Sequence, residues 1–291
     1  MICVYSLIVN PVAGNGRAQQ ARALVEKELA EKGLPFKTFL TERPGQGQAL
    51  AAQAAAEGAK AVIAIGGDGT AFEVACGLMD TGVPMGLIPA GTGNDFIKTA
   101  KISKDPLAAL NFILTHEPRN VDTGKLNDRL FLNVCGTGFD VLTLDFAEKA
   151  KKYVRGILPY LYGVIRAIFA YKPVPVELVL DNGTTINDEV LICAVANGGV
   201  FGCGIAIAPC AQMDDHLLDV VVLKAVPRWR LPGYLHGLLK GTILKFDITT
   251  HYRCRSCRLK SKGMRLNADG EIFPLDEAEF ESQQGRLSLF W

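Results

Sequence analysis

Three short apolar segments in the first third of the chain each end in a loop of glycine and small polar residues. The loops cover residues 10–16 (NPVAGNG), 66–70 (GGDGT) and 91–95 (GTGND). Apolar strands that alternate with helices are typical of a parallel sheet, and the carboxyl ends of its strands share one edge. The pattern therefore predicts an α/β fold in which the three loops converge on one crevice.

The chain of 291 residues is long enough for two domains. Expected strands cover residues 3–9, 37–40, 61–65 and 85–88, and expected helices cover residues 17–32, 46–57 and 70–80, with one more helix starting at Asp105-Pro106. Beyond residue 121, turn dipeptides at Asn127-Asp128 and Asn182-Gly183 separate β-rich segments, and helical insertions are expected at 142–152, 159–170 and 229–240. We therefore expect an α/β domain with a parallel sheet at residues 1–121 and a mainly-β domain at residues 122–291.

Composition excludes several classes of protein. A balance of 31 Lys+Arg against 30 Asp+Glu argues against a nucleic-acid binder that works by bulk charge. The eight cysteines lie mostly in apolar runs, which indicates reduced thiols and a cytoplasmic protein. The longest uncharged stretch, residues 190–213, is interrupted by glycine, asparagine and proline, so it predicts buried strands and no transmembrane segment.

Charge is segregated late in the chain. Residues 224–265 hold 11 basic residues and one acid, whereas residues 269–281 hold six acids and no base. Pairing of these two segments across a sheet is the simpler interpretation, and a surface for anionic lipid or nucleotide phosphate is the alternative.

The glycine loops predict a phosphate site. Glycine lets the backbone approach a phosphate closely, and the helix that follows presents its positive end. These loops do not contain a Walker motif, because that motif needs Ser or Thr after Gly-Lys and the only Gly-Lys pair, Gly124-Lys125, precedes Leu126. They do not contain a GxGxxG dinucleotide motif either, because Phe96 stands where a third glycine is needed. A carboxylate at Asp68, inside GGDGT, is well placed to hold a magnesium ion or to organise its water shell.

Taken together, these motifs resemble a family. GGDGT is shared by diacylglycerol kinases, sphingosine kinases and NAD kinases, and NPxxG at residues 10–14 with GTGNDF at 91–96 narrows the resemblance to bacterial diacylglycerol-kinase-like lipid kinases. The segment MDDHLLDVVVL at 213–223 is similar to the family's DGLLDV segment, and residues 269–271 are similar to its DGE. The resemblance covers nearly the whole chain in the right order.

The resemblance implies an ATP-binding catalytic domain at residues 1–121 and a β-sandwich lipid-substrate domain at residues 122–291, with the active site in the cleft between them. The residues implied to contact ATP are Asn10, Pro11, Val12, Ala13, Gly14, Thr41, Gly66, Gly67, Asp68, Gly69, Thr70, Ala71, Phe72, Thr92, Asn94 and Asp95. The implied catalytic residues are Asp68, with Glu271 or Asp269 as the general base or next to it. A structural Mg²⁺ site is implied at Asp215, with backbone carbonyls of Gln212 and Leu217.

This sequence departs from the family pattern at two places. His216 replaces the glycine of DGLLD, so the implied magnesium loop lacks a glycine that could set its conformation. The stretch TERPGQGQA at residues 41–49 is also longer than the family's usual version, which bears on Thr41.

A lipid acceptor implies peripheral contact with a membrane, so we expect a cytoplasmic protein that associates transiently with lipid. The candidate docking segments are Lys149, Lys152 and Arg155 with residues 157–171, and residues 228–240. For both segments, a helix packed on the β domain is the alternative interpretation. The sequence leaves a homodimer open.

The predicted function is an ATP- and Mg²⁺-dependent lipid kinase acting on a hydroxyl of diacylglycerol or a related lipid. An NAD kinase and a catalytically idle nucleotide- or lipid-binding regulator are the alternatives. Cys254 and Cys257 form a lone CxxC pair with no second pair, which gives little support to a zinc or redox role.

Overall fold

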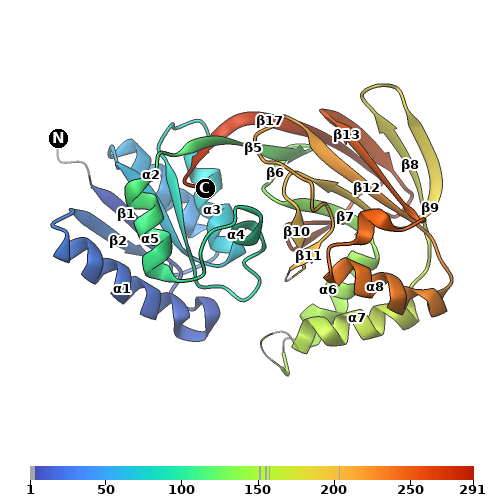
Figure 1. Cartoon of the computed structure of the whole chain (residues 1–291), viewed down its shortest axis with the longest axis horizontal. Coiled ribbons are helices and arrows are strands. Elements are labelled where there is room, and N and C mark those ends of the chain that lie inside the picture. The colour runs from blue at the N-terminus through green and yellow to red at the C-terminus, as the bar shows by residue number, and fades with distance from the viewer. Residues whose placement is uncertain (1–3, 151, 155, 157, 203) are drawn as a thin grey trace. The chain divides into compact units, whose positions relative to one another are not determined.

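The computed structural model describes residues 4–150, 152–154, 156, 158–202 and 204–291, which form two compact units (Figure 1). The first contains Met1–Asp122 and Gln284–Trp291, and the second contains Thr123–Gln283. The sequence-based boundary near residue 121 lies next to this division. Residues 284–291 differ from the expectation, because the chain returns to the first unit within its last strand, β17 (Glu277–Leu289).

The first unit is built on a parallel sheet with the strand order β2-β1-β3-β4-β17. Its other strands are β1 (Tyr5–Val9), β2 (Phe36–Leu40), β3 (Ala61–Gly66) and β4 (Met85–Pro89). Every residue of β1, β3 and β4 is buried, which explains why these strands read as continuous apolar runs.

A short 3-10 helix, η1 (Ala13–Gly16), follows β1, and the described part of the first unit also contains five α-helices. They are α1 (Arg17–Glu31), α2 (Gln46–Ala56), α3 (Asp68–Leu78), α4 (Asp95–Thr99) and α5 (Pro106–Thr115). Helix α1 packs on α5, and α2 packs on α3. The expected start of α5 is confirmed, because the Asp105 side chain accepts a hydrogen bond from Ala108 N–H (2.7 Å). Helix α4 was not predicted, since its five residues carry no periodic pattern.

The second unit is mainly β, as predicted, and its described strand pairs are antiparallel. Its strands, besides the start of β17, are the end of β5 (Arg119–Leu126), β6 (Arg129–Phe131), β7 (Val134–Gly138), β8 (Val174–Leu180), β9 (Thr185–Ala196), β10 (Val200–Phe201), β11 (Ile205–Ala206), β12 (Leu218–Lys224), β13 (Thr249–Cys254), β14 (Ser256–Lys260), β15 (Arg265–Ala268) and β16 (Glu271–Pro274). The long strand β9 pairs with β8 along its first half and with both β7 and β12 along its second half.

Two apolar cores stabilise this β-sandwich-like unit. One lies among the strands and includes Phe131, Leu259 and Phe280. The other includes residues of the sheet and of the three helices α6 (Phe139–Ala150), α7 (Leu158–Ala170) and α8 (Leu231–Leu239). The predicted helical insertions correspond to these helices. Within the described ranges, no helix has both the length and the apolar character that a bilayer crossing requires.

Part of the segregated charge pairs across the sheet, as the simpler interpretation predicts, whereas Lys224, Arg253 and Arg265 pair with acids outside residues 269–281. Strand β14 pairs with β17, and Arg258 forms ion pairs with Glu277 (3.4 Å) and Glu279 (2.9 Å). Lys260 also contacts Glu277 (3.3 Å). Because these side chains are about half exposed, each pair adds at most about 1 kcal/mol to stability.

Candidate active site

The three glycine loops meet at one edge of the first unit. Because β1, β3 and β4 are parallel neighbours, the loops that follow them lie at the same carboxyl edge. Main-chain hydrogen bonds join them: Asn10 N–H donates to the Ile65 carbonyl (3.1 Å), and Ala90 N–H and Gly91 N–H donate to the Gly66 carbonyl (2.7 and 3.1 Å). The structure thus brings together the loops that the sequence predicted to converge.

Glycine is required where these loops touch. A Cβ atom on Gly91 would lie 2.4 Å from the Gly67 Cα, and a Cβ atom on Gly14 would lie 1.8 Å from the Ala90 carbonyl oxygen. Gly14 also has a φ of +63°, which side chains rarely tolerate. The loops therefore present bare backbone, which allows a phosphate to come close to the amides.

Helices α1 and α3 begin at this edge, and of their first amides the Arg17 N–H already donates to the carbonyls of Ala13 and Gly14. Helix α1 starts after Gly16 and helix α3 after Gly67, and neither cap residue accepts a side-chain hydrogen bond from the first turn. The first-turn N–H groups of a helix have no partner inside it, and the helix dipole adds partial positive charge. This arrangement favours binding of an anion such as a phosphate group.

Asp68 is the first residue of α3, and its carboxylate reaches the start of α4. Its Oδ1 accepts a hydrogen bond from Phe96 N–H (3.0 Å), which ties the loop after β4 to the loop after β3. Burial raises the pKa of Asp68, and the nearby Asp95 carboxylate raises it further. Asp68 therefore holds the loops together and also supplies negative charge that a bound cation would offset.

Arg17 is a cation at this edge that the sequence analysis did not single out. Its guanidinium donates to the carbonyl of Gly14 (3.0 Å) and to the carbonyl of Gly91 (2.8 Å). It therefore links the first and third loops from the first turn of α1. The sequence did contain an indication of this role, since Arg17 directly follows the glycine-rich loop at residues 10–16. Its contact with Gly91, 74 residues away, depends on the fold.

The other residues predicted to contact nucleotide also belong to this edge. Thr41 follows β2, and its N–H donates to the Val9 carbonyl (2.9 Å). Val12 and Thr92 are exposed, whereas Thr70 and Asn94 are buried. The remaining predicted contacts are Pro11, Ala13, Gly69, Ala71 and Phe72, which lie in the loop after β1 or in the first turns of α3. Their role in nucleotide binding stays a prediction.

In the second unit, Asp269 and Glu271 flank the tip of the β15–β16 hairpin. Asp269 and Gly270 form the two-residue turn with φ values of +46° and +98°. The Asp269 carboxylate accepts hydrogen bonds from the amides of Leu132 (2.6 Å), Asn133 (3.0 Å) and Val134 (3.1 Å). Glu271, by contrast, is exposed at the start of β16. Because Asp269 is occupied by main-chain donors, Glu271 is the better candidate for a general base.

A buried acid, Asp140, contacts the β15–β16 hairpin through Asn267. Asp140, in the first turn of α6, contacts the Asn267 Nδ2 (3.4 Å), and the Asn267 Oδ1 accepts a hydrogen bond from Gly270 N–H (2.9 Å). Burial raises the pKa of Asp140 to about 6. Its Oδ1 is buried without a hydrogen-bond partner among the described residues. Asp140 escaped the sequence analysis because nothing in the stretch GFDV distinguishes a buried acid from an exposed helix start.

Replacing Asp140 with asparagine is expected to stabilise the protein increasingly as pH rises. The folded pKa of about 6 lies above the unfolded value of about 3.9, so the wild type loses stability as pH rises through this range. At about 1.4 kcal/mol per pH unit, the loss approaches roughly 3 kcal/mol above about pH 7. Denaturant unfolding of the wild type and of Asp140→Asn at several pH values measures this loss of stability. Parallel stability curves for wild type and Asp140→Asn would show that Asp140 does not ionise with this pKa.

The loop implied to hold structural magnesium has other partners. The Asp215 carboxylate forms an ion pair with Arg253, and its Oδ1 accepts a hydrogen bond from Leu217 N–H (3.1 Å). His216 adopts the left-handed backbone (φ +64°) that favours glycine, so this loop turns despite the substitution. The Arg253 guanidinium and the Leu217 amide therefore compete with a cation for this carboxylate, and the Mg²⁺ site at Asp215 with the carbonyls of Gln212 and Leu217 stays a prediction.

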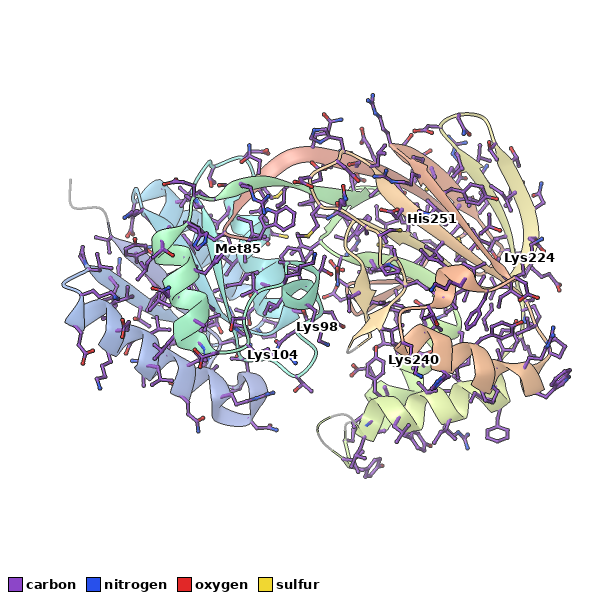
Figure 2. All side chains as sticks on the ribbon, in the orientation of Figure 1. Met85, Lys98, Lys104, Lys224, Lys240 and His251 are labelled. Atoms are coloured by element: carbon purple, nitrogen blue, oxygen red, sulfur yellow. The ribbon has the colours of Figure 1, made fainter. Side chains whose placement is uncertain are left out.

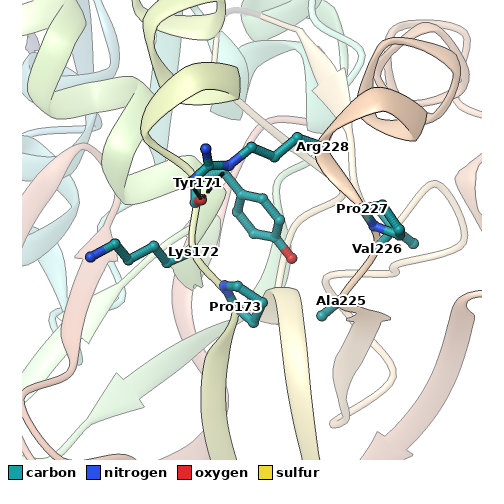
Figure 3. A pocket seen from close by; sticks show the side chains of 7 residues that line it. All are labelled: Tyr171, Lys172, Pro173, Ala225, Val226, Pro227 and Arg228. Carbon is teal, nitrogen blue, oxygen red and sulfur yellow. Dashed lines mark hydrogen bonds between the residues drawn. The ribbon is translucent and has the colours of Figure 1, made fainter.

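A pocket of about 380 Å³ in the second unit is lined by residues 171–173 and 225–228 (Figure 3). Lys172 and Arg228 are the cations among these residues, and Arg228 donates two hydrogen bonds to the Tyr171 carbonyl (3.1 and 2.9 Å), directly after the end of α7. Such a contact caps a helix C-terminus. None of the predicted catalytic residues lines this pocket, so we assign it no role in the chemistry.

Both units of the chain are similar to known domain families. Residues 5–126 match the family described as the diacylglycerol kinase catalytic domain, and residues 133–290 match the YegS C-terminal NAD kinase beta sandwich-like domain. A Pseudomonas putida protein named "Probable lipid kinase YegS-like" is 33% identical over 266 residues, which cover 90% of this chain and 87% of that protein. A Mycobacterium tuberculosis protein named "Diacylglycerol kinase" is 28% identical over 271 residues, covering 91% and 87%.

A solved structure has the same fold. The crystal structure of a diacylglycerol kinase from Bacillus anthracis superposes with a TM-score of 0.77 at 23% identity, covering 100% of this chain and 97% of that one. Both units of this chain therefore have counterparts in one known fold.

Proposed function

We propose, because this chain belongs to the family of diacylglycerol kinases and YegS-like lipid kinases, that it transfers the γ-phosphoryl group of ATP to a hydroxyl of diacylglycerol or a related lipid. Members of this family are phosphotransferases with an alcohol acceptor. The observation that carries the proposal is the convergence of three bare glycine loops and the amide ends of α1 and α3 at one sheet edge.

Phosphoryl transfer needs charge neutralisation and positioning more than covalent work by the protein. The first-turn amides of α1 and α3 supply donors for the phosphate oxygens of ATP. Arg17 adds a full positive charge next to the first and third loops. These groups are fixed before the nucleotide binds, so they stabilise charge without reorganising during the reaction.

A magnesium ion that enters with ATP fits the chemistry of this edge. Asp68 and Asp95 are close enough for the Asp95 charge to raise the Asp68 pKa, and carboxylate oxygens are the ligands that Mg²⁺ prefers. These two residues would hold the ion or its water shell. When bound, the ion would neutralise phosphate charge; no step of the proposal passes through the Asp215 loop.

Glu271 is the proposed general base for the acceptor hydroxyl. An exposed carboxylate at the start of β16 can accept a proton from a bound alcohol, whereas the Asp269 oxygens already accept three amide hydrogens. Asp269 instead positions the loop from Leu132 to Val134 and anchors the hairpin that carries Glu271.

An assay with radiolabelled ATP tests this function. Purified protein is incubated with labelled ATP, Mg²⁺ and a mixed lipid extract, and a parallel reaction contains NAD in place of lipid. We expect label in the lipid fraction alone. Transfer to NAD would favour the NAD kinase alternative, and ATP binding without transfer to any lipid would favour the idle regulator.

Helix α7 is the proposed contact with the membrane that holds the acceptor. Gly163 packs closely on α6, where a Cβ atom would lie 2.4 Å from the Thr143 carbonyl oxygen, and Pro159 and Ala167 are buried on the same side. The opposite side carries a stripe of exposed apolar residues: Leu158, Leu161, Tyr162, Ile165 and Phe169. An apolar face of this kind suits the interface of a lipid bilayer.

The second predicted docking segment is less suited to this role. Leu231 and Leu238 of α8 are buried in the core beside the sheet. The exposed Trp229 lies before α8, in the short 3-10 helix η2 (Arg228–Arg230). Of the basic cluster predicted to accompany α7, Lys149 and Lys152 are described, whereas Arg155 and residue 157 lie outside the described residues.

Replacing Ile165 and Phe169 together with glutamate is expected to weaken vesicle binding at least about 10-fold, because each buried apolar side chain contributes about 1.5–3 kcal/mol. Phe169 is 73% exposed, so the variant should fold normally. Sedimentation with vesicles rich in anionic lipid measures binding. The matched control is Leu24→Glu, which replaces an exposed leucine on α1 of the first unit.

Two outcomes would contradict this docking surface. Unchanged vesicle binding by the double variant would exclude α7 as the contact. Conversion of a dimer to a monomer with unchanged vesicle binding would show that a second copy of the chain covers this face.

A further inference from the structure

Three metal-ligating side chains of the second unit converge on one point. The Cys210 Sγ lies 3.7 Å from the His251 Nε2 and 3.8 Å from the Asp219 Oδ1, and the His251 Nε2 lies 2.6 Å from the same Asp219 oxygen. These three are the one group of histidine, cysteine and acidic side chains in the described part of the chain whose ligand atoms all lie within 4.8 Å of one another. The sequence analysis did not connect them, because His251 is 41 residues from Cys210.

The fold fixes two of these residues rigidly. Strands β12 and β13 pair with Asp219 opposite Arg253 and Val221 opposite His251, so Asp219 and His251 are diagonal neighbours on one face of the ladder. Figure 2 labels His251 on β13. Cys210 comes from the connection before β12, in a turn closed by the hydrogen bond from Ala211 N–H to the Ala208 carbonyl (3.0 Å).

The arrangement does not match a nucleophilic triad. In a Cys/His/Asp triad, the thiol and the carboxylate contact different nitrogens of the imidazole, so that the ring takes the proton of the thiol while the carboxylate orients the ring. Here both contact the Nε2 atom. Three donor atoms that face one another in this way are arranged as ligands around a shared centre.

Their separations are close to those of a tetrahedral zinc site. With metal–ligand bonds of about 2.0–2.3 Å, neighbouring donor atoms in such a site lie roughly 3.3–3.7 Å apart. The two separations from sulfur are near this range. The third is a hydrogen bond between imidazole and carboxylate at 2.6 Å, which would open by about 0.7 Å around a metal ion.

Burial and charge also favour a cation at this point. Asp219 is 1% exposed, and its Oδ2 has no hydrogen-bond partner among the described residues. The Arg253 Nε lies 3.7 Å from the Oδ1 of this carboxylate, and the same guanidinium also pairs with Asp215. A buried carboxylate with an unsatisfied oxygen costs stability that metal coordination would recover. Cys210 is exposed, which gives an ion a path from solvent.

We propose that Cys210, Asp219 and His251 bind a divalent transition metal of the zinc class, with a fourth position open to solvent. Thiolate and imidazole ligands select zinc over magnesium, which prefers oxygen donors. The proposed ligands include none of the residues assigned to the nucleotide's cation or to the implied magnesium site at Asp215. The proposed site does not depend on the lipid kinase activity. A bound ion would clamp the turn carrying Cys210 to the β12–β13 pair.

The test uses the purified full chain after dialysis against a chelator. Zinc binding is measured by competition with a chromophoric chelator, and cobalt is added separately to detect a thiolate-to-cobalt charge-transfer band. We expect one zinc ion per chain, the cobalt band, and a rise in melting temperature with zinc. Cys210→Ser should abolish the band, and Cys210→Ser and His251→Ala should each weaken zinc binding more than the roughly 10–100-fold cost of losing an outer-shell partner.

Control variants at other cysteines and histidines test whether zinc binding is specific to the proposed site. Cys76→Ser removes a partly buried thiol of α3, and His236→Ala removes an exposed histidine of α8, so both should bind zinc like the wild type. Zinc affinity unchanged in Cys210→Ser, or lost only in Cys254→Ser or Cys257→Ser, would overturn the proposal. So would the absence of zinc and cobalt binding in a wild-type chain whose circular dichroism shows a folded protein.

Discussion

Replacement of Asp68 with asparagine is expected to lower the rate of phosphoryl transfer about 100- to 1,000-fold, the scale of removing one preorganised electrostatic group. The amide oxygen of asparagine can still accept the hydrogen bond from Phe96 N–H, so the loop after β4 keeps its anchor. What disappears is the negative charge that, next to Asp95, would hold the nucleotide's cation. Initial rates with labelled ATP and a lipid acceptor measure the effect.

The same variant should leave stability almost unchanged. Loss of repulsion between Asp68 and Asp95 offsets the weaker hydrogen bond, so we expect a change in unfolding free energy below about 1 kcal/mol. Glu57→Gln is the matched control, because this exposed acid ends α2, whose C-terminus lies at the opposite edge of the parallel sheet. Near-wild-type activity in a folded Asp68→Asn protein would refute the assignment.

The sequence alone was sufficient to predict that the three glycine loops meet at one edge of the sheet. Parallel strands place their carboxyl ends together whatever their order, so three glycine loops after three apolar runs had to meet if the strands were neighbours. Short sequence motifs also predicted local structure correctly: Asp105 caps α5, and Asn182-Gly183 lies in the turn of the β8–β9 hairpin. These features depend on a few consecutive residues.

The partners of the key carboxylates depend on residues far apart in the chain. Asp68 binds an amide 28 residues away, and Asp269 binds amides 135 to 137 residues away. No periodicity encodes such pairs. The same holds for the Arg253 contact with Asp215, which a motif match could not reveal because the motif describes one side of the contact. Return of β17 to the first sheet was missed because only Leu289 pairs there.

Separate replacement of Glu271 and Asp269 is expected to have different effects: the Glu271 variant loses turnover, and the Asp269 variant loses stability. Glu271→Gln should lower the turnover rate about 100- to 10,000-fold, the usual contribution of a general base, because a neutral amide cannot take the proton of the acceptor hydroxyl. Its melting temperature should match the wild type, since Glu271 is exposed. Turnover at saturating lipid and thermal unfolding of the same preparations measure both quantities.

Asp269→Asn should show the reverse pattern. An asparagine offers one acceptor oxygen in place of the two that now receive three amide hydrogens, and each hydrogen bond to a charged group contributes about 1.5–3 kcal/mol. We therefore expect a loss of roughly 2–4 kcal/mol in unfolding free energy, with turnover per folded molecule reduced less than in Glu271→Gln. If Asp269→Asn were instead fully stable and inactive while Glu271→Gln kept its turnover, the base would be Asp269, and the three amides would be the groups that orient it.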